Sequence, residues 1–253
     1  MLQPRVIPCL LLKNGGLVKT VKFKDARYIG DPINAVKIFN EKEVDELMFL
    51  DISATVENHV PPFDTIGAIA SECFMPMGYG GGVRNLEDVR RIIGLGVEKV
   101  AVNSFLVENP DFISEVASCT GSQSLIASID TRKHKRGHYE VFTHGGTKKS
   151  DWELVRLAQM VEAKGAGEIM LTSIDHDGTM QGYDIELIKS ITACVNIPVV
   201  ASGGAGSLDH IRDAIHEGGA SACAIGSMAV YYGKSRAVLI TYPTRQELNA
   251  IFT

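Results

Sequence analysis

The sequence predicts an α/β fold, a closed (β/α)8 TIM barrel with an internal twofold, half-barrel repeat. Three observations support this prediction. Short apolar runs alternate with amphipathic stretches of helical period, the runs are apolar on both faces as buried parallel strands are, and part of the first half recurs in the second. A chain of 253 residues that is 45% apolar can bury the core of such a barrel.

The predicted strands leave room for a helix between most successive pairs. Amphipathic stretches include "NLEDVRRIIGLG" at 85–96 and "DWELVRLAQMVEAKG" at 151–165, and a capping box from Ser150 to Glu153 is expected to start the second. Eight such units indicate a closed barrel, with an open doubly wound sheet as the alternative. The apolar runs lie near 5–12, 46–51, 74–79, 98–103, 124–130, 167–173, 196–201 and 221–227.

An internal repeat favours the closed barrel. "GGVRNLEDVRRIIGLG" at 81–96 aligns without gaps on "GGAGSLDHIRDAIHEG" at 203–218, and the same offset pairs "ELMFL" with "EIMLT" at 168–172. Two matches at one offset of about half the chain predict half-barrels of about 1–120 and 121–253 within one domain, 1–253.

Composition excludes several classes of protein. The net charge of −5 and the lack of a long basic run argue against nucleic acid as a partner. No apolar stretch has the length of a membrane span, and the N-terminus lacks a signal-peptide pattern. The five cysteines are scattered, as reduced thiols in a cytoplasmic protein are, and no clustered ligands suggest a metal. We therefore expect a cytoplasmic protein without a metal or other cofactor.

Two glycine-rich turns predict phosphate sites. "YGGGVR" at 79–84 and "ASGGAGS" at 201–207 each follow an apolar run and precede a helix, and "VNS" at 102–104 and "IGS" at 225–227 end the next strands. Glycine lets backbone amides approach an anion closely at a helix N-terminus, although a plain tight turn is the alternative. The expected ligand carries phosphates at both ends, or is one long phosphorylated body across the barrel mouth.

Carboxylates at strand ends are the candidates for acid–base chemistry. Asp130 ends the fifth predicted strand and Asp51 ends the second. Asp175 and Asp177 follow the sixth, where extended backbone would place both on one side, unless Asp-x-Asp-Gly is simply a turn. A lone His176 between them is a weak metal signal.

Two long loops, 13–31 and 131–150, occupy matching positions in the two halves and look like small hairpins. Long loops at this face of a barrel often act as lids. Lys19, in the first loop, could swing onto substrate or could be a solvated lysine.

Charged residues mark the starts of four strands, Arg5, Glu46, Lys99 and Glu168. All four are expected near the N-terminal face of the barrel. Two cations and two anions there could close into a salt-bridge ring around the axis that plugs or gates the barrel, or could form a solvated rim.

These features together resemble the cyclase subunit of imidazole glycerol phosphate synthase, a (β/α)8 barrel. The likeness runs from "RVIPCL" to about residue 228 and includes "GDP" at 30–32, "DELMFLDISAT", "GGGVRNLEDV", "GVEKVAVNS", "GSQSLIASID", "GAGEIMLTSIDHDGTMQGYD" and "VVASGGAGSLDH". The resemblance implies a lyase-type synthase subunit of histidine biosynthesis, with a glutaminase partner on the N-terminal face and ammonia passing through the barrel. The four strand-start charges match the family's gate.

The candidate site residues come partly from the strand ends and loops and partly from the resemblance, which implies Asp130 as an acid–base group. The acid–base candidates are Asp130, Asp51, Asp177 and Lys19. The phosphate-binding candidates, from the glycine turns and the family pattern together, are Gly81, Gly82, Asn103, Ser104, Gly178, Thr179, Gly203, Gly204, Gly226 and Ser227.

The chain departs from the family at a catalytic position. The family's cyclase uses aspartates at the ends of strands one and five, and Asp130 matches the second. Where the family has Cys-Leu-Asp-Val-Lys, this chain has Cys9-Leu10-Leu11-Leu12-Lys13. A leucine cannot transfer a proton, and losing a general acid or base costs about 10²–10⁴ in rate, which brings ordinary imidazole closure into question.

The tail also departs, because "SMAVYYGKSRAVLITYPTRQELNAIFT" lacks the family's usual last helix and carries "AVLITYP" instead. Both deviations resemble a divergent branch found beside amidotransferases that amidinate surface-polysaccharide sugars, as in lipopolysaccharide biosynthesis. There the barrel would conduct ammonia for a separate acceptor-bearing enzyme.

Three functions follow as hypotheses. The first is an ammonia-using synthase subunit whose acceptor is either the phosphorylated ribulosyl intermediate of histidine synthesis or a sugar. The second is a phosphosugar isomerase of the histidine-pathway barrel type, which would need no gate and would want a carboxylate on strand one. The third is a non-catalytic ammonia conduit.

Overall fold

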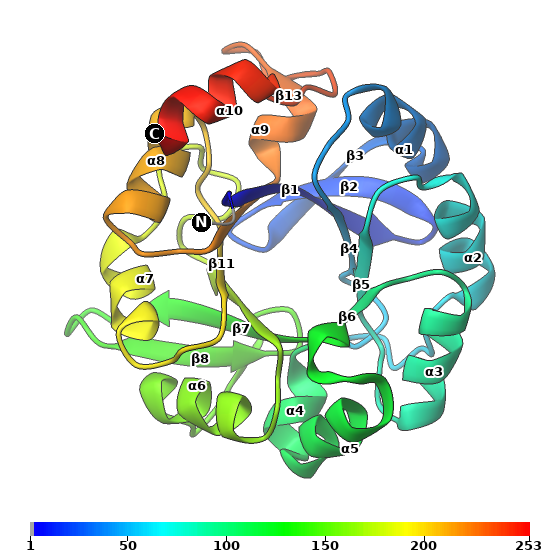
Figure 1. Ribbon diagram of the computed structural model, residues 1–253, viewed down its shortest axis with the longest axis vertical. Helices are drawn as coiled ribbons and strands as arrows, with labels where there is room; N and C mark the ends of the chain where they lie inside the picture. The colour runs from blue at the N-terminus through cyan, green and yellow to red at the C-terminus, as the bar shows by residue number, and fades with distance from the viewer. Residues whose placement is uncertain (1–2) are drawn as a thin grey trace.

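The computed structural model describes residues 3–253, which form a closed parallel barrel surrounded by helices (Figure 1). Each barrel strand pairs in parallel with its neighbours, and the last pairs with the first, which closes the sheet. The predicted fold class is confirmed. The barrel strands are β1 (Arg5–Lys13), β4 (Leu47–Asp51), β5 (Met77–Gly80), β6 (Lys99–Val102), β7 (Leu125–Lys133), β10 (Glu168–Ser173), β11 (Val199–Ser202) and β12 (Ala222–Ile225).

Helices cover the outside of the barrel, and several begin at side chains suited to a helix start. Asp31, Asn85, Asp184 and Ser207 each accept a hydrogen bond from a backbone amide three residues on. The helices are α1 (Pro32–Glu41), α2 (Phe63–Glu72), α3 (Leu86–Gly94), α4 (Ser104–Glu108), α5 (Asp111–Thr120), α6 (Leu154–Ala163), α7 (Ile185–Thr192), α8 (Leu208–His216), α9 (Ser227–Val230) and α10 (Arg245–Phe252), with a 3₁₀ turn at Ser122–Ser124.

Strand side chains alternate between two cores. The larger core lies between the sheet and the helices and contains Phe39, Leu47 and Tyr79. A separate cluster lies in the barrel interior: Ile7, Cys9, Met48, Ala101, Ile126, Met170, Val200, Ala222 and Ala224. The space between the two ends of the barrel is therefore lined by small or apolar side chains.

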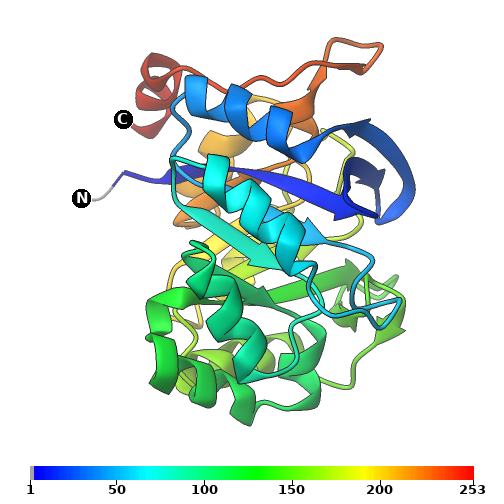
Figure 2. The ribbon, with the colours of Figure 1, turned by 90° about the vertical axis from the view of Figure 1, so that its right-hand side faces the viewer.

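Three hairpins follow the carboxyl ends of barrel strands. After β1 come β2 (Gly16–Val21) and β3 (Lys24–Gly30), and after β7 come β8 (Tyr139–Thr143) and β9 (Lys148–Lys149). The two predicted hairpins are thus confirmed. A third, β13 (Tyr231–Tyr232) with β14 (Ala237–Val238), follows β12 and α9. All three lie at the end of the barrel opposite the N-terminus (Figure 2).

Two local expectations are wrong. Helix α6 starts at Leu154, one residue after Glu153, which is itself the N-cap and accepts from the amides of Val155 and Arg156. Ser150 Oγ instead accepts from the Trp152 amide at 3.2 Å.

The C-terminal tail does end in a helix, α10, which starts with a capping box of Thr244 and Glu247. No helix among residues 3–253 combines the length and the apolarity that crossing a membrane requires.

Candidate active site

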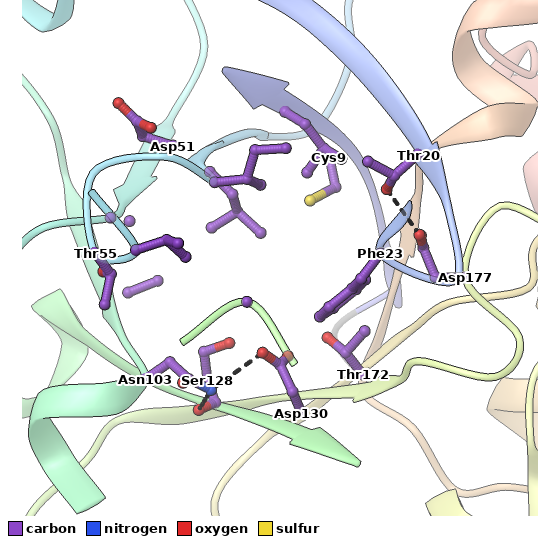
Figure 3. A pocket seen from close by; sticks show the side chains of 18 of the residues that line it. Cys9, Thr20, Phe23, Asp51, Thr55, Asn103, Ser128, Asp130, Thr172 and Asp177 are labelled. Carbon is purple, nitrogen blue, oxygen red and sulfur yellow. Dashed lines mark hydrogen bonds between the residues drawn. The ribbon is translucent and has the colours of Figure 1, made fainter. Parts of the chain in front are cut away.

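A pocket of about 770 Å³ opens at the carboxyl ends of the barrel strands (Figure 3). It is lined by Asp130, Asp51, Asp177 and Lys19, the four residues proposed for catalysis, and by Leu11. Of the ten residues proposed to bind phosphate, only Thr179 is not among its lining residues. The hydroxyl of Thr179 donates to the carbonyl of His176 at 2.7 Å, because residues 174–179 form a tight turn.

Asp130 is partly buried on the polar wall of the pocket. Its Oδ2 accepts a hydrogen bond from Asn103 Nδ2 at 3.2 Å, and the same amide group donates to the Ser128 carbonyl at 3.0 Å. Burial raises the pKa of Asp130 to about 7, against a lowering by the Thr172 side chain and with a further rise from the charge of Asp177. A carboxyl group that titrates near neutrality can serve as a general acid or base.

Lys19 and Asp177 form a buried ion pair. Lys19 Nζ lies 2.9 Å from Asp177 Oδ1, and Thr20 Oγ1 donates to Asp177 Oδ2 at 3.0 Å. Lys19 is only 6% exposed and lies on β2. It is therefore neither a solvated lysine nor one free to swing, and it ties the first hairpin to the loop after β10.

Asp175, two residues before Asp177, contacts a different strand. Asp175 Oδ2 accepts from the backbone amide of Lys133, so the two aspartates of the Asp-x-Asp motif bind different strands. The expectation that both lie on one side is wrong, because residues 174–179 turn instead of extending. His176 Nδ1 lies 2.8 Å from the Gly182 carbonyl. Residues 3–253 contain no cluster of three or more His, Cys, Asp or Glu side chains that could hold a metal ion.

The geometry argues against Asp51 as a proton-transfer group. One carboxylate oxygen accepts from the Ser53 amide, the Ser53 hydroxyl and the Ala54 amide at 2.8, 2.7 and 3.0 Å. Figure 3 shows the carboxylate turned away from the centre of the pocket. Asp51 therefore holds the loop after β4 in place, a role that its position at a strand end did not reveal.

An apolar wall faces the pocket from β1 and β4. Leu11 is paired in register with Leu50 of β4 and Val18 of β2, and both leucines line the pocket. Phe23, at the turn between β2 and β3, also projects into it (Figure 3). Sequence reasoning did not single out Phe23, because an aromatic residue in a hairpin turn carries no functional signal by itself.

The glycine turns bring backbone close to the pocket. Gly204 has φ +118°, and a Cβ there would lie 2.0 Å from the Gly182 carbonyl oxygen, so no larger residue fits. Ser227 Oγ is buried and has no hydrogen-bond partner among the described residues, which leaves it available to a ligand. Ser104 Oγ, by contrast, accepts from the His144 amide and donates to Asn103 Oδ1.

At the opposite end of the barrel, the four strand-start charges form a closed ring. Arg5 contacts Glu46 through one guanidinium nitrogen and Glu168 through the other. Lys99 Nζ lies 3.0 Å from Glu46 and 3.2 Å from Glu168. The side chains of the two glutamates are 3% and 7% exposed, so each anion is enclosed between two cations.

A family model described as "Histidine biosynthesis protein" matches residues 5–236. The chain belongs to this family. It is also 52% identical over 253 residues to a Leptospira borgpetersenii protein named "Putative imidazole glycerol phosphate synthase subunit HisF", with full coverage of both chains. A Pseudomonas aeruginosa protein of that name, numbered hisF2, is 49% identical over 249 residues, 98% of this chain and 99% of its own.

Proposed function

We propose that this chain is the ammonia-using, cyclase-type synthase subunit of a glutamine amidotransferase pair. A phosphorylated substrate would bind in the pocket, and a glutaminase subunit would dock on the N-terminal face and supply ammonia through the barrel. The observation that carries the proposal is the pairing of a closed charged ring at one end with a pocket at the other. The names of the similar proteins support the same role.

The barrel interior suits neutral ammonia. The interior cluster below the pocket includes Met48, Met170 and Ala222, which are all apolar. An ammonium ion would lose its hydration there at a far larger cost than neutral ammonia would. The ring would exclude water and ions until its ion pairs separate.

In the pocket, Asp130 would move protons, because its surroundings keep it near its titration point and Asn103 orients one of its oxygens. Lys19 and Asp177 would position the hairpin that carries Phe23 over the ligand. The two glycine turns, with Asn103 and Ser104 on one side and Gly178, Gly226 and Ser227 on the other, would each hold a phosphate.

The identity of residue 11 determines which nitrogen acceptor we propose. Imidazole closure in the family uses a second aspartate where this chain has Leu11, so we propose that nitrogen passes to a sugar instead of to the phosphorylated ribulosyl intermediate. A phosphosugar isomerase is disfavoured, because it would not require the charged ring and would require a carboxylate on β1. A non-catalytic conduit is the remaining alternative, and the partly buried Asp130, whose pKa is raised to about 7, argues against it.

Incubating the purified chain with an ammonium salt and the phosphorylated ribulosyl intermediate tests the acceptor. The proposal expects little or no imidazole product, and robust turnover would refute the sugar assignment. In the native complex, Asp130→Asn should abolish nitrogen transfer, whereas full retention of activity would favour the conduit.

A further inference from the structure

Three hairpins at the C-terminal face differ in charge from the rest of the chain. We define the crown as the three hairpin segments 13–27, 131–149 and 231–238, which all lie at the end of the barrel opposite the N-terminus (Figure 2). The crown holds 13 of the 25 Lys and Arg residues but only Asp25 and Glu140 of the 30 acidic residues. Its formal charge is +11, against −16 for the remaining chain.

Most crown cations have no acidic partner within the described part of the chain. Lys19, Lys133, Lys148 and Lys149 lie within ion-pair distance of a carboxylate. A concentration of like charge repels itself and attracts an opposite charge from outside the chain. Within residues 3–253, no ion pair involves Lys13, Lys22, Lys24, Arg27, Arg132, Lys135, Arg136, Lys234 or Arg236.

Exposed apolar side chains gather at the same end. Among the described residues, nine large hydrophobic side chains are exposed, and only Ile38 and Phe74 lie outside the loops and hairpins that follow barrel strands. The other seven are Val21, Tyr28, Val56, Val60, Tyr232, Val238 and Leu239, of which Val60, Tyr28 and Tyr232 are 70%, 66% and 65% exposed. Exposed apolar groups that collect in one region mark interaction sites.

We infer that the crown and these apolar residues form a docking surface for a protein with an acidic face, which covers the mouth of the pocket. Arginine and tyrosine are typical of protein interfaces, and a charge of +11 selects an acidic partner. A membrane surface fits less well, since membrane-bound helices present one continuous apolar face. Here the apolar residues come from several separate loops around a concave pocket.

This inference goes beyond the proposed function, because it depends on charge and exposure and holds whether or not ammonia passes through the barrel. It rests on the proposed function only for the role assigned to the docked protein. With Leu11 in place of a carboxylate, a protein over the mouth would receive nitrogen from the pocket without loss to solvent.

Photo-crosslinking of the full chain in its native cell tests the surface. A crosslinking residue is placed at Tyr232 or at Val60, with Phe74 as the control, because Phe74 is 84% exposed and lies in the connection before β5. We expect one acidic protein to be captured from both crown-side positions and not from Phe74. Capture of nothing, or the same capture from all three positions, would overturn the inference.

Affinity measurements with the captured, purified protein test whether the crown cations contribute to binding. The crown triple variant is Arg27→Glu, Lys135→Glu and Lys234→Glu, one in each hairpin. The matched triple is Arg90→Glu, Arg156→Glu and Lys189→Glu, three exposed cations on α3, α6 and α7. At low salt we expect Kd to rise by at least about 10-fold for the crown triple and by less than about two-fold for the matched triple.

An equal effect of the two triples would overturn the inference. So would binding of the unmodified chain to vesicles of anionic phospholipid that competes with the captured protein. Glutaminase binding, measured on the same variants, reports on the other end of the barrel and should not change. Failure of the unmodified chain to bind a glutaminase would count against the proposed function and leave the docking result intact.

Discussion

Lys19 and Asp177 lie 158 residues apart in the chain and meet in the pocket, with Nζ 2.9 Å from Oδ1. The Lys22 amide donates to the Asp177 carbonyl at 2.9 Å, so backbone and side chain fasten the same two segments. The contact sets the position of the β2–β3 hairpin, and with it the position of Phe23 inside the pocket (Figure 3).

Removing the cation of this pair should be costly. Lys19→Met leaves the Asp177 carboxylate, whose side chain is 15% exposed, without its counter-ion, and we expect a loss of up to about 3 kcal/mol in the free energy of unfolding. Asp177→Asn, paired with Lys19→Met, should recover part of that loss because no uncompensated charge remains. Urea denaturation measures both, with the exposed Lys22→Met as the control. A Lys19→Met variant as stable as Lys22→Met would refute a structural role for the pair.

Asp130 should make stability depend on pH. Its pKa in the folded protein is about 7, raised from 3.8 chiefly by burial. Below the unfolded value both states bind the proton, so burial carries no charge penalty. As pH rises from about 4 to about 7, the unfolded state ionises first and stability falls, levelling off above the folded value.

The Asp130→Asn variant removes this titration. Relative to the unmodified chain, its free energy of unfolding should increase between about pH 4 and pH 7, by no more than about 4 kcal/mol, and then stay constant. Thermal or urea unfolding across that range is the measurement, with the exposed Asp64→Asn as the control. A pH-independent difference between Asp130→Asn and the unmodified chain would contradict the assignment.

Leu11→Asp tests whether the missing carboxylate at position 11 prevents imidazole closure. If the missing carboxylate is what prevents imidazole closure, the variant should form imidazole product from ammonia and the phosphorylated ribulosyl intermediate about 10²–10⁴-fold faster than the unmodified chain. Leu11→Asn separates polarity from proton transfer and should gain little. Equal rates for the unmodified chain and Leu11→Asp would show that Leu11 does not decide the acceptor.

Ser227→Ala tests the phosphate site that has an unsatisfied hydroxyl. Because Ser227 Oγ has no partner among the described residues, its removal should leave the stability of the chain nearly unchanged. Binding of inorganic phosphate should weaken by about 10- to 150-fold, the effect of one hydrogen bond to a charged group. Calorimetric titration measures the affinity, and Thr179→Val, outside the pocket, should bind as before. Equal affinity for Ser227→Ala and the unmodified chain would exclude this contact.

Much of the molecule could be predicted from patterns that lie along single strands. The charged ring follows from four strand starts, and the barrel from its repeat. The predictions that were wrong concerned residues whose roles depend on contacts between distant segments or on competition between local hydrogen bonds. The burial of Lys19 depends on Asp177, and Asp51 is occupied by the amides of its own loop. Glu153 caps α6 in place of Ser150, because α6 begins at Leu154 and the Ser150 hydroxyl accepts from the Trp152 amide before it.

The final test concerns the ring, through which nitrogen is proposed to enter. The native complex is given amide-¹⁵N-labelled glutamine in the presence of excess unlabelled ammonium, and the isotope content of the aminated product is read by mass spectrometry. The proposed route predicts a product that carries mainly glutamine-derived nitrogen, and a Lys99→Met variant with an opened ring whose product moves toward the bulk isotope ratio. A product from the unmodified complex that already has the bulk ratio would contradict passage of ammonia through the barrel.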